Sequence, residues 1–160
     1  MNTDFANIEG IFNTNTGIVQ TAIGDIAPDD WFRQPGDESN HLTFVLGHLA
    51  VHRGRVVNLL GGKWAAPWSK LFTRGTERVA REEYPPIEEI KNAWNDASQQ
   101  LAARFKTASP ELLSQPAPEG PPSFDKKISG VVVFLAFHEA YHVGQVSYLR
   151  KWLGYGQTVG

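Results

Sequence analysis

ISGVVVFLAFHEAYHVGQVSYLRKWLG, residues 128–154, carries the clearest structural pattern in the sequence. Apolar residues and two histidines recur there every three or four positions, the spacing of one face of an α-helix. These positions are Ile128, Val131, Val132, Leu135, His138, His142, Val146, Leu149 and Leu153. Gly154 is a natural stop, because glycine readily adopts the left-handed conformation that ends many helices. The stretch predicts one long helix with a buried face.

Three earlier segments repeat this spacing. We expect helices over residues 3–26, 42–60 and 87–105. Asp37 or Ser39 is suited to capping the second helix, and Gly61 to ending it. No segment alternates apolar and polar residues as a half-buried strand does. The pattern therefore predicts an all-α fold, a four-helix bundle.

Two long connections separate these helices, after the second helix and after the third. Residues 61–86 contain Trp64, Trp68 and Phe72, so we expect this connection to pack over the bundle instead of forming a disordered linker. Residues 110–122 are rich in proline. The first connection is long enough to return along a helix, which leaves both a crossover and a plain up-down order open.

The composition fits a single domain over residues 1–160. The chain is 41% apolar and 20% charged, which is ordinary for a globular protein with one core. The formal charge is −2 and no long basic run occurs, which argues against a nucleic-acid partner. With no signal-peptide pattern and no run of about 18 apolar residues, we expect a soluble, cytoplasmic protein with no membrane partner.

The histidines provide the main functional pattern. The chain has no cysteine, so any metal must bind to nitrogen and oxygen ligands. All five histidines fall in two groups, His41, His48 and His52 in the second helical region and His138 and His142 in the last. Two residues four apart on a helix point the same way, with Cβ atoms about 5–6 Å apart, and their imidazoles can bind one ion.

A metal site is one of two interpretations of the His138 and His142 pair. Both rings are expected to face the core, where an unpaired polar group is costly, and a metal would satisfy them. His48 or His52 on a facing helix can add a third nitrogen, and three protein ligands with an open position are typical of a catalytic ion. The other interpretation is a half-buried pair bonded to water or to a backbone carbonyl.

The motifs GHLA, residues 47–50, and HEAYHVGQVSYLR, residues 138–150, followed by Leu153 and Gly154, resemble the DinB/YfiT superfamily of four-helix proteins. The resemblance covers nearly the whole chain in helix order and spacing. It implies a divalent metal on His48, His138 and His142, and commonly a homodimer. It also implies that some relatives are metal-dependent transferases or isomerases that use a low-molecular-weight thiol.

Several nearby residues have more than one interpretation. His52 is an alternative third ligand, a fourth ligand, a hydrogen-bond partner of a ligand or a core-edge histidine. Gln145 shares the face of the histidine pair and could bond to a ligand ring or to bound water, or lie at the surface. Tyr141 could line a pocket above the metal. Three tryptophans could either line this pocket or belong to the core. They are Trp31, Trp64 and Trp68.

The charged residues indicate a function less clearly than the histidines do. Glu139 is rotated by about 100° from His138, which makes it a doubtful ligand. We expect His41 to be exposed. Four basic residues could bind an anionic substrate, but charges at a helix end or outer face usually meet water. They are Arg53, Arg55, Arg150 and Lys151.

The leading hypothesis from the sequence is a metal-dependent enzyme acting on a small-molecule substrate. A divalent ion would lower the pKa of a water or thiol in its open position. Thiol transfer or isomerisation follows from the resemblance, and hydrolysis is the competing chemistry. A non-catalytic metal-binding stress-response or small-ligand-binding bundle is the alternative, and a metal-free structural bundle the third. Three imidazoles suit zinc, nickel, iron or copper, so the metal's identity stays open.

Overall fold

The computed structural model describes residues 3–73, 75–76 and 79–159. Its long helices are α1 (Thr3–Ile23), α2 (Leu42–Leu59), α3 (Ile87–Thr107) and α5 (Ile128–Trp152). The short ones are α4 (Pro110–Leu113) and the 3-10 helices η1 (Pro28–Phe32), η2 (Ser69–Phe72) and η3 (Arg81–Glu83). The described residues contain no strand beyond one isolated bridge. The all-helical prediction is confirmed, and α4 adds one turn that the sequence pattern did not indicate.

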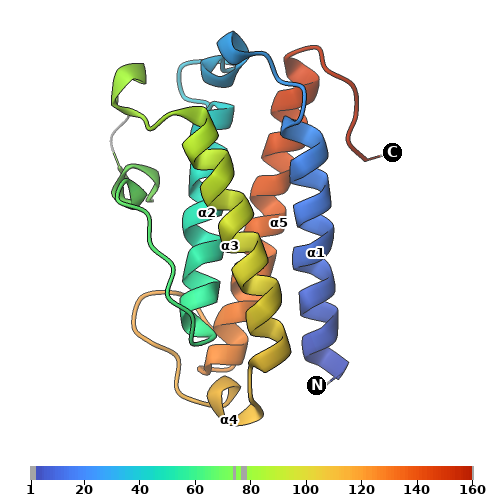
Figure 1. The fold of residues 1–160 in the computed structure, drawn as a ribbon, viewed down its shortest axis with the longest axis vertical. Helices are drawn as coiled ribbons and strands as arrows, with labels where there is room; N and C mark the ends of the chain where they lie inside the picture. The colour runs from blue at the N-terminus through green and yellow to red at the C-terminus, as the bar shows by residue number, and fades with distance from the viewer. Residues whose placement is uncertain (1–2, 74, 77–78, 160) are drawn as a thin grey trace.

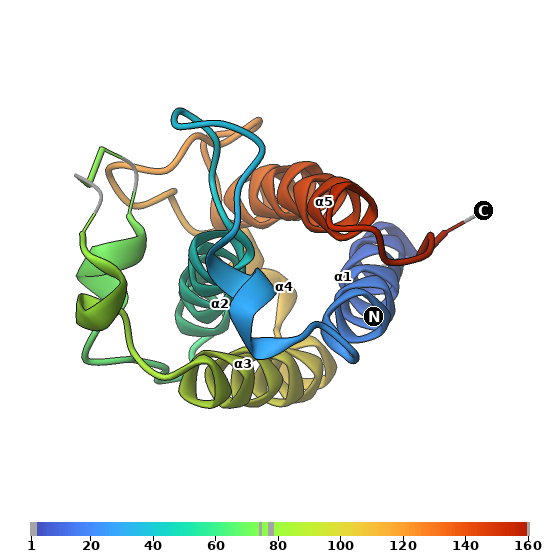
Figure 2. The ribbon, with the colours of Figure 1, turned by 90° about the horizontal axis from the view of Figure 1, so that it is seen from above.

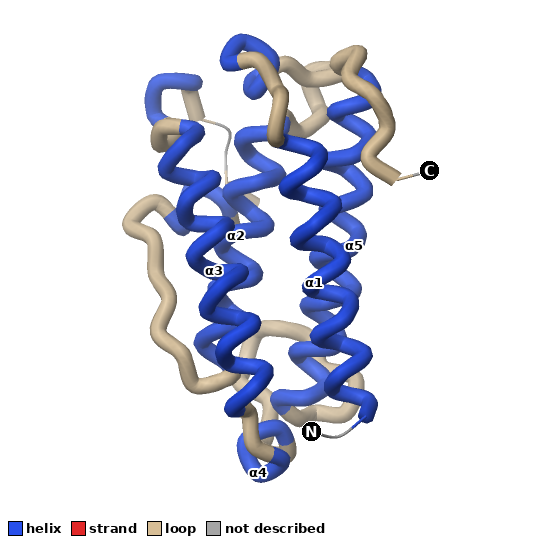
Figure 3. The backbone as a smooth tube through the Cα atoms, turned by 45° about the vertical axis from the view of Figure 1, so that its right-hand side comes forward, coloured by secondary structure: helices blue, strands red, loops and turns tan. Residues whose placement is uncertain are grey.

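The four long helices form a bundle with a crossover (Figure 1). α1 and α5 run upward in this view, whereas α2 and α3 both run downward. Seen from above, α5 lies between α1 and α2, and α2 lies between α5 and α3 (Figure 2). The connection between α2 and α3 returns along the outside of the bundle (Figure 3). This settles the helix order that the sequence left open, and it makes α2 and α5 antiparallel neighbours.

The core is formed by the periodic apolar residues of each helix. α3 shows this most simply, because its buried residues are spaced three or four apart while the positions between them face outward. They are Ile90, Trp94, Ala97, Leu101 and Phe105. No helix in the described part of the chain is both long and apolar enough to cross a membrane.

The start of α2 differs from the prediction. His41 caps this helix, because its Nδ1 accepts a hydrogen bond of 3.1 Å from the backbone N–H of Phe44. The cap is neither Asp37 nor Ser39. The His41 ring is also buried, against Phe32 and Tyr84, so the expectation that it is exposed was wrong. The chain before α2 and the connection after it fold over this end of the helix, which local sequence does not reveal.

The first long connection lies directly on α2. Gly47 and Gly54 are seven residues apart, two turns of the helix, and share one face. A Cβ atom at Gly54 would overlap the ring of Trp64, and one at Gly47 would overlap the ring of Phe72. The two glycines therefore let both aromatic rings rest on the helix backbone, and the prediction that this connection packs over the bundle is confirmed.

The substitution Gly54→Ala tests this packing. The new methyl group must displace the Trp64 ring, and overpacking of this kind costs about 1–3 kcal/mol of unfolding free energy. Gly17→Ala is the matched control, because nothing lies within 4 Å of its Cβ position; alanine in an open helix interior stabilises by about 0.5–1 kcal/mol. Urea denaturation measures both variants. Equal stabilisation of the two would contradict the close approach of Trp64 to α2.

Candidate metal centre

Three histidines from two helices meet between α2 and α5. His48 comes from α2, and His138 and His142 lie one turn apart on α5. The Nε2 atom of His138 lies 3.4 Å from Nε2 of His48 and 3.2 Å from Nε2 of His142. One nitrogen from each ring lies within 4.8 Å of the other two. The antiparallel packing of α2 and α5 thus brings together the two histidine groups that the sequence separates.

Two of these rings are oriented through their other nitrogen. His48 Nδ1 lies 2.7 Å from the backbone oxygen of Phe72, and His142 Nδ1 lies 2.7 Å from Oε1 of Gln145. Both partners are acceptors, so each Nδ1 carries the proton and each Nε2 presents its lone pair to the centre. Gln145 was a sequence candidate for such a partner. The Phe72 carbonyl was missed, because a backbone oxygen leaves no mark in the sequence.

The cluster fits a divalent metal ion. In a tetrahedral site with metal–nitrogen bonds of about 2.0–2.1 Å, two ligand nitrogens lie about 3.3 Å apart, close to the separations around His138. Without an ion, the lone pairs of His48 and His142 both face His138 Nε2, which can donate one proton to only one of them. His138 Nδ1 is buried with no hydrogen-bond partner among the described residues. Three imidazoles form a donor set that suits zinc, nickel or iron.

The surroundings keep these imidazoles neutral. Burial, with repulsion from the neighbouring rings, lowers the pKa of His48 and of His138 to about 4. Burial also lowers the pKa of His142, against the raising effect of its bond to Gln145. Neutral imidazole is the form that binds metal, and a low pKa means that no proton competes near neutral pH.

His52 lies beside the cluster but does not belong to it. Its ring centroid is 4.2 Å from that of His48 and 4.4 Å from that of His138, yet the three converging nitrogens do not include one of its own. Burial lowers its pKa to about 2. Its Nδ1 is buried without a partner among the described residues. His52 therefore adds a neutral polar ring to the wall of the site.

A pocket of about 710 Å³ opens beside the histidines. It is lined by His48, His52, Arg55, Asn58, Leu59, residues 118–122, Phe134, Leu135 and His138. The tryptophans considered as pocket residues are buried in the core instead. Tyr141 does not line this pocket: it is 61% exposed, with its ring edge-on to His142 at 5.1 Å.

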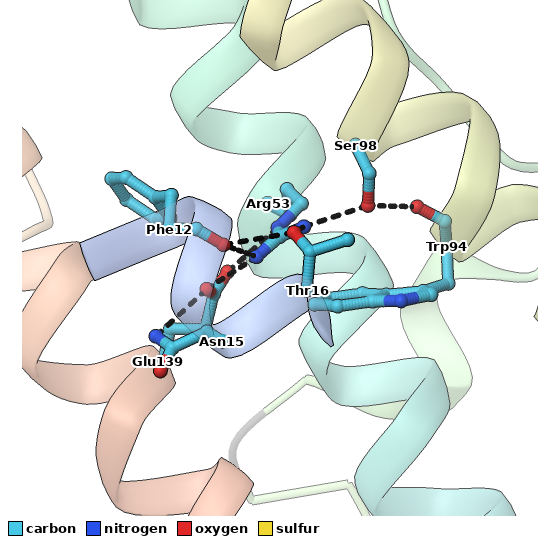
Figure 4. Close-up of polar contacts among 7 residues, drawn as sticks. All are labelled: Phe12, Asn15, Thr16, Arg53, Trp94, Ser98 and Glu139. Carbon is cyan, nitrogen blue, oxygen red and sulfur yellow. Dashed lines mark hydrogen bonds and ion pairs between the residues drawn. The ribbon is translucent and has the colours of Figure 1, made fainter. Parts of the chain in front are cut away.

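A buried ion pair between Arg53 and Glu139 joins α2 and α5 (Figure 4). Arg53 Nε donates to Glu139 Oε2 at 2.8 Å, and Arg53 Nη2 donates to Oε1 at 2.5 Å. Both side chains are almost inaccessible, at 1% and 2%. The guanidinium group also stacks on the Trp94 ring at 3.8 Å. The carboxylate of Glu139 is therefore fully engaged, which agrees with the prediction that it is a poor metal ligand.

The remaining hydrogen-bonding groups of this pair come from α1 and α3. Arg53 donates to three further oxygens and Glu139 accepts from one further amide, so the four long helices meet here. The partners are Thr16 Oγ1, Ser98 Oγ, the Phe12 backbone oxygen and Asn15 Nδ2.

The expectation that Arg53 and Arg150 meet water was wrong. Arg53 is buried because α2 is covered on several sides, by α3, α5 and η2. Arg150 is 8% exposed, pairs with Asp25 and donates to the Ala22 backbone oxygen. The C-terminal half of α5 packs beside α1. The face of α5 that carries Arg150 is therefore an interface between two helices, whereas the sequence suggested that it faces water.

Removing one partner of the buried pair should be costly. Arg53→Met leaves the Glu139 carboxylate buried without a counter-charge, and we expect the unfolding free energy to fall by about 3–5 kcal/mol. Arg33→Met is the control, because Arg33 pairs with Asp30 at the surface, where such a bridge contributes at most about 1 kcal/mol. Urea denaturation compares the two variants. If Arg53→Met lowered the free energy of unfolding as little as Arg33→Met does, the buried pair would not be central to the stability of the bundle.

The lowered pKa values predict the pH dependence of the metal-free protein. A histidine in the unfolded chain has a pKa near 6.5, whereas the folded values of His48, His52 and His138 are far lower. As the pH falls from about 7 to 5, the unfolded chain takes up protons that the folded rings refuse, so the folded state loses stability. Urea denaturation with chelator present measures this slope. The variant His52→Leu should show a shallower slope, and an unchanged one would contradict the burial of His52.

Comparison with known proteins identifies a family for this chain. A family model described as the DinB superfamily matches residues 12–146, which includes α2, α3 and the histidines of α5. Among curated proteins, no match to the chain is found. The matched residues make up most of the chain. The motifs around His48 and His138 had already indicated a resemblance to this family. The chain therefore belongs to the DinB superfamily.

Proposed function

We propose that this protein is a metal-dependent enzyme acting on a small molecule, with one divalent ion held by His48, His138 and His142. The observation that carries the proposal is the convergence of three Nε2 atoms beside a pocket of about 710 Å³. Three nitrogen ligands leave an open position, which is the arrangement of a catalytic ion and not of a closed structural one.

The residues of the chain have separate tasks in this proposal. The Phe72 carbonyl and Gln145 hold the His48 and His142 rings so that Nε2 points inward. Burial keeps the imidazoles unprotonated and ready to bind. When bound, the ion supplies a Lewis acid that lowers the pKa of a coordinated thiol or water. The pocket holds the small-molecule substrate next to this position.

Thiol transfer or isomerisation is the reaction we propose, because the family resemblance implies a low-molecular-weight thiol as co-substrate. Hydrolysis is the second candidate, since the same Lewis acid can activate water. A purely metal-binding module would be favoured by a fourth protein ligand that closes the site. His52 stands outside the three converging nitrogens and lines the pocket, which favours an open site and thus an enzyme.

The homodimer implied by the resemblance stays a prediction. Large exposed aromatic residues follow one side of α5 at spacings of four, seven and four, and such a row is typical of an interaction surface. They are Phe137, Tyr141, Tyr148 and Trp152.

Metal content tests the proposed site directly. Untagged protein, purified without a metal column, should contain about one equivalent of zinc, nickel or iron by elemental analysis. The double variant His138→Ala/His142→Ala should contain almost none, and His48→Ala should bind weakly. His52→Ala is the matched control and should retain its metal. If His52→Ala lost its metal while His48→Ala kept it, His52 and not His48 would be the third ligand. If the wild type held no metal, even after reloading, the proposal would be refuted.

A further inference from the structure

We propose that the pocket beside the histidine cluster binds a small organic acid, with its carboxylate on Arg55 and its reacting end toward His48 and His138. The inference rests on the proposed function for the direction in which the molecule lies.

Arg55 lines the same pocket as His48 and His52. Residues 48, 52, 55 and 59 follow one another at spacings of four, three and four, so they form one stripe on α2. All four line the pocket. A long side chain on this stripe can therefore reach the same ligand as the histidines, from about two helical turns away.

Arg55 has no counter-ion in the part of the chain that the structure describes. Within the described residues, the ion-paired arginines are Arg33, Arg53 and Arg150, and no hydrogen bond engages the Arg55 side chain. A guanidinium group left unpaired in a pocket is suited to forming two parallel hydrogen bonds with a carboxylate.

The charges around the pocket also favour a ligand with a single negative charge. Three neutral imidazoles would leave the charge of a divalent ion uncompensated, and Arg55 adds a further positive charge. Within the described lining, Glu119 is the acidic residue; it favours a singly charged carboxylate over a doubly charged phosphate. The Asn58 amide is already bonded to the Trp64 backbone through both its oxygen and its nitrogen. Within the described lining, Arg55 is the residue with a permanent positive charge.

The apolar residues of the lining indicate the chemical character of the rest of the ligand. The lining includes Leu59, Phe134 and Leu135, together with the prolines of the segment 118–122. These surfaces suit a hydrocarbon chain or ring between the two polar ends. The predicted ligand is therefore a compact organic acid with an apolar middle.

Paired hydroxamates can test this selection. A hydroxamate group binds zinc, so it anchors both members of a pair at the cluster. The monohydroxamates of succinic, glutaric and adipic acid carry a terminal carboxylate at increasing distance, and the alkyl hydroxamates of matching length carry none. Isothermal titration calorimetry with the zinc-loaded protein should show at least one acid binding roughly ten-fold more tightly than its neutral partner.

Arg55→Gln should abolish this preference while leaving the neutral hydroxamates bound as before. Arg33→Gln, a surface control remote from the pocket lining, should keep it. If neither class of hydroxamate binds and zinc is not retained, the proposed metal site fails and the inference fails with it. If both classes bind equally to the wild type, or if Arg55→Gln keeps the preference, the metal site stands and this inference alone is overturned.

Discussion

The ion pair between Arg53 and Glu139 is the constraint on which the arrangement of the bundle depends. Two charges removed from water carry a large desolvation cost, which only close geometry and further hydrogen bonds can offset. Here the guanidinium and the carboxylate bond to each other twice, and α1 and α3 supply partners for their remaining groups. Because guanidinium donors point in fixed directions, these helices must lie at matching heights along the bundle.

The same constraint places the histidines. Arg53 directly follows His52, and Glu139 directly follows His138. Adjacent residues on a helix differ by about 100° in direction, so the ion pair faces the centre of the bundle while the rings face the pocket. The register that aligns Arg53 with Glu139 also brings His48 to the height of His138 and His142. Engagement of Glu139 by Arg53 keeps an acidic ligand away from the cluster, which is therefore built from neutral nitrogens.

The two long connections also contribute to the site. The crossover after α2 rests on the backbone through Gly47 and Gly54 and delivers the Phe72 carbonyl to the His48 ring. The segment before α5 contributes prolines and Glu119 to the lining of the pocket. Both elements come from outside the four periodic helices. The helices thus set the positions of the imidazoles, while the connections orient one of them and shape the space beside it.

The sequence by itself determined the helical segments, the common direction of His138 and His142, and the candidacy of His48, because helical periodicity and short motifs are local. It misjudged His41, Arg53 and Arg150, whose burial depends on which faces other segments cover. Only the tertiary structure decided the crossover, the pairing of Arg53 with Glu139, the role of the Phe72 carbonyl and the place of His48 in the cluster ahead of His52. Each of these depends on the axial register between segments distant in the chain, and residue spacing within one helix contains no information about that register.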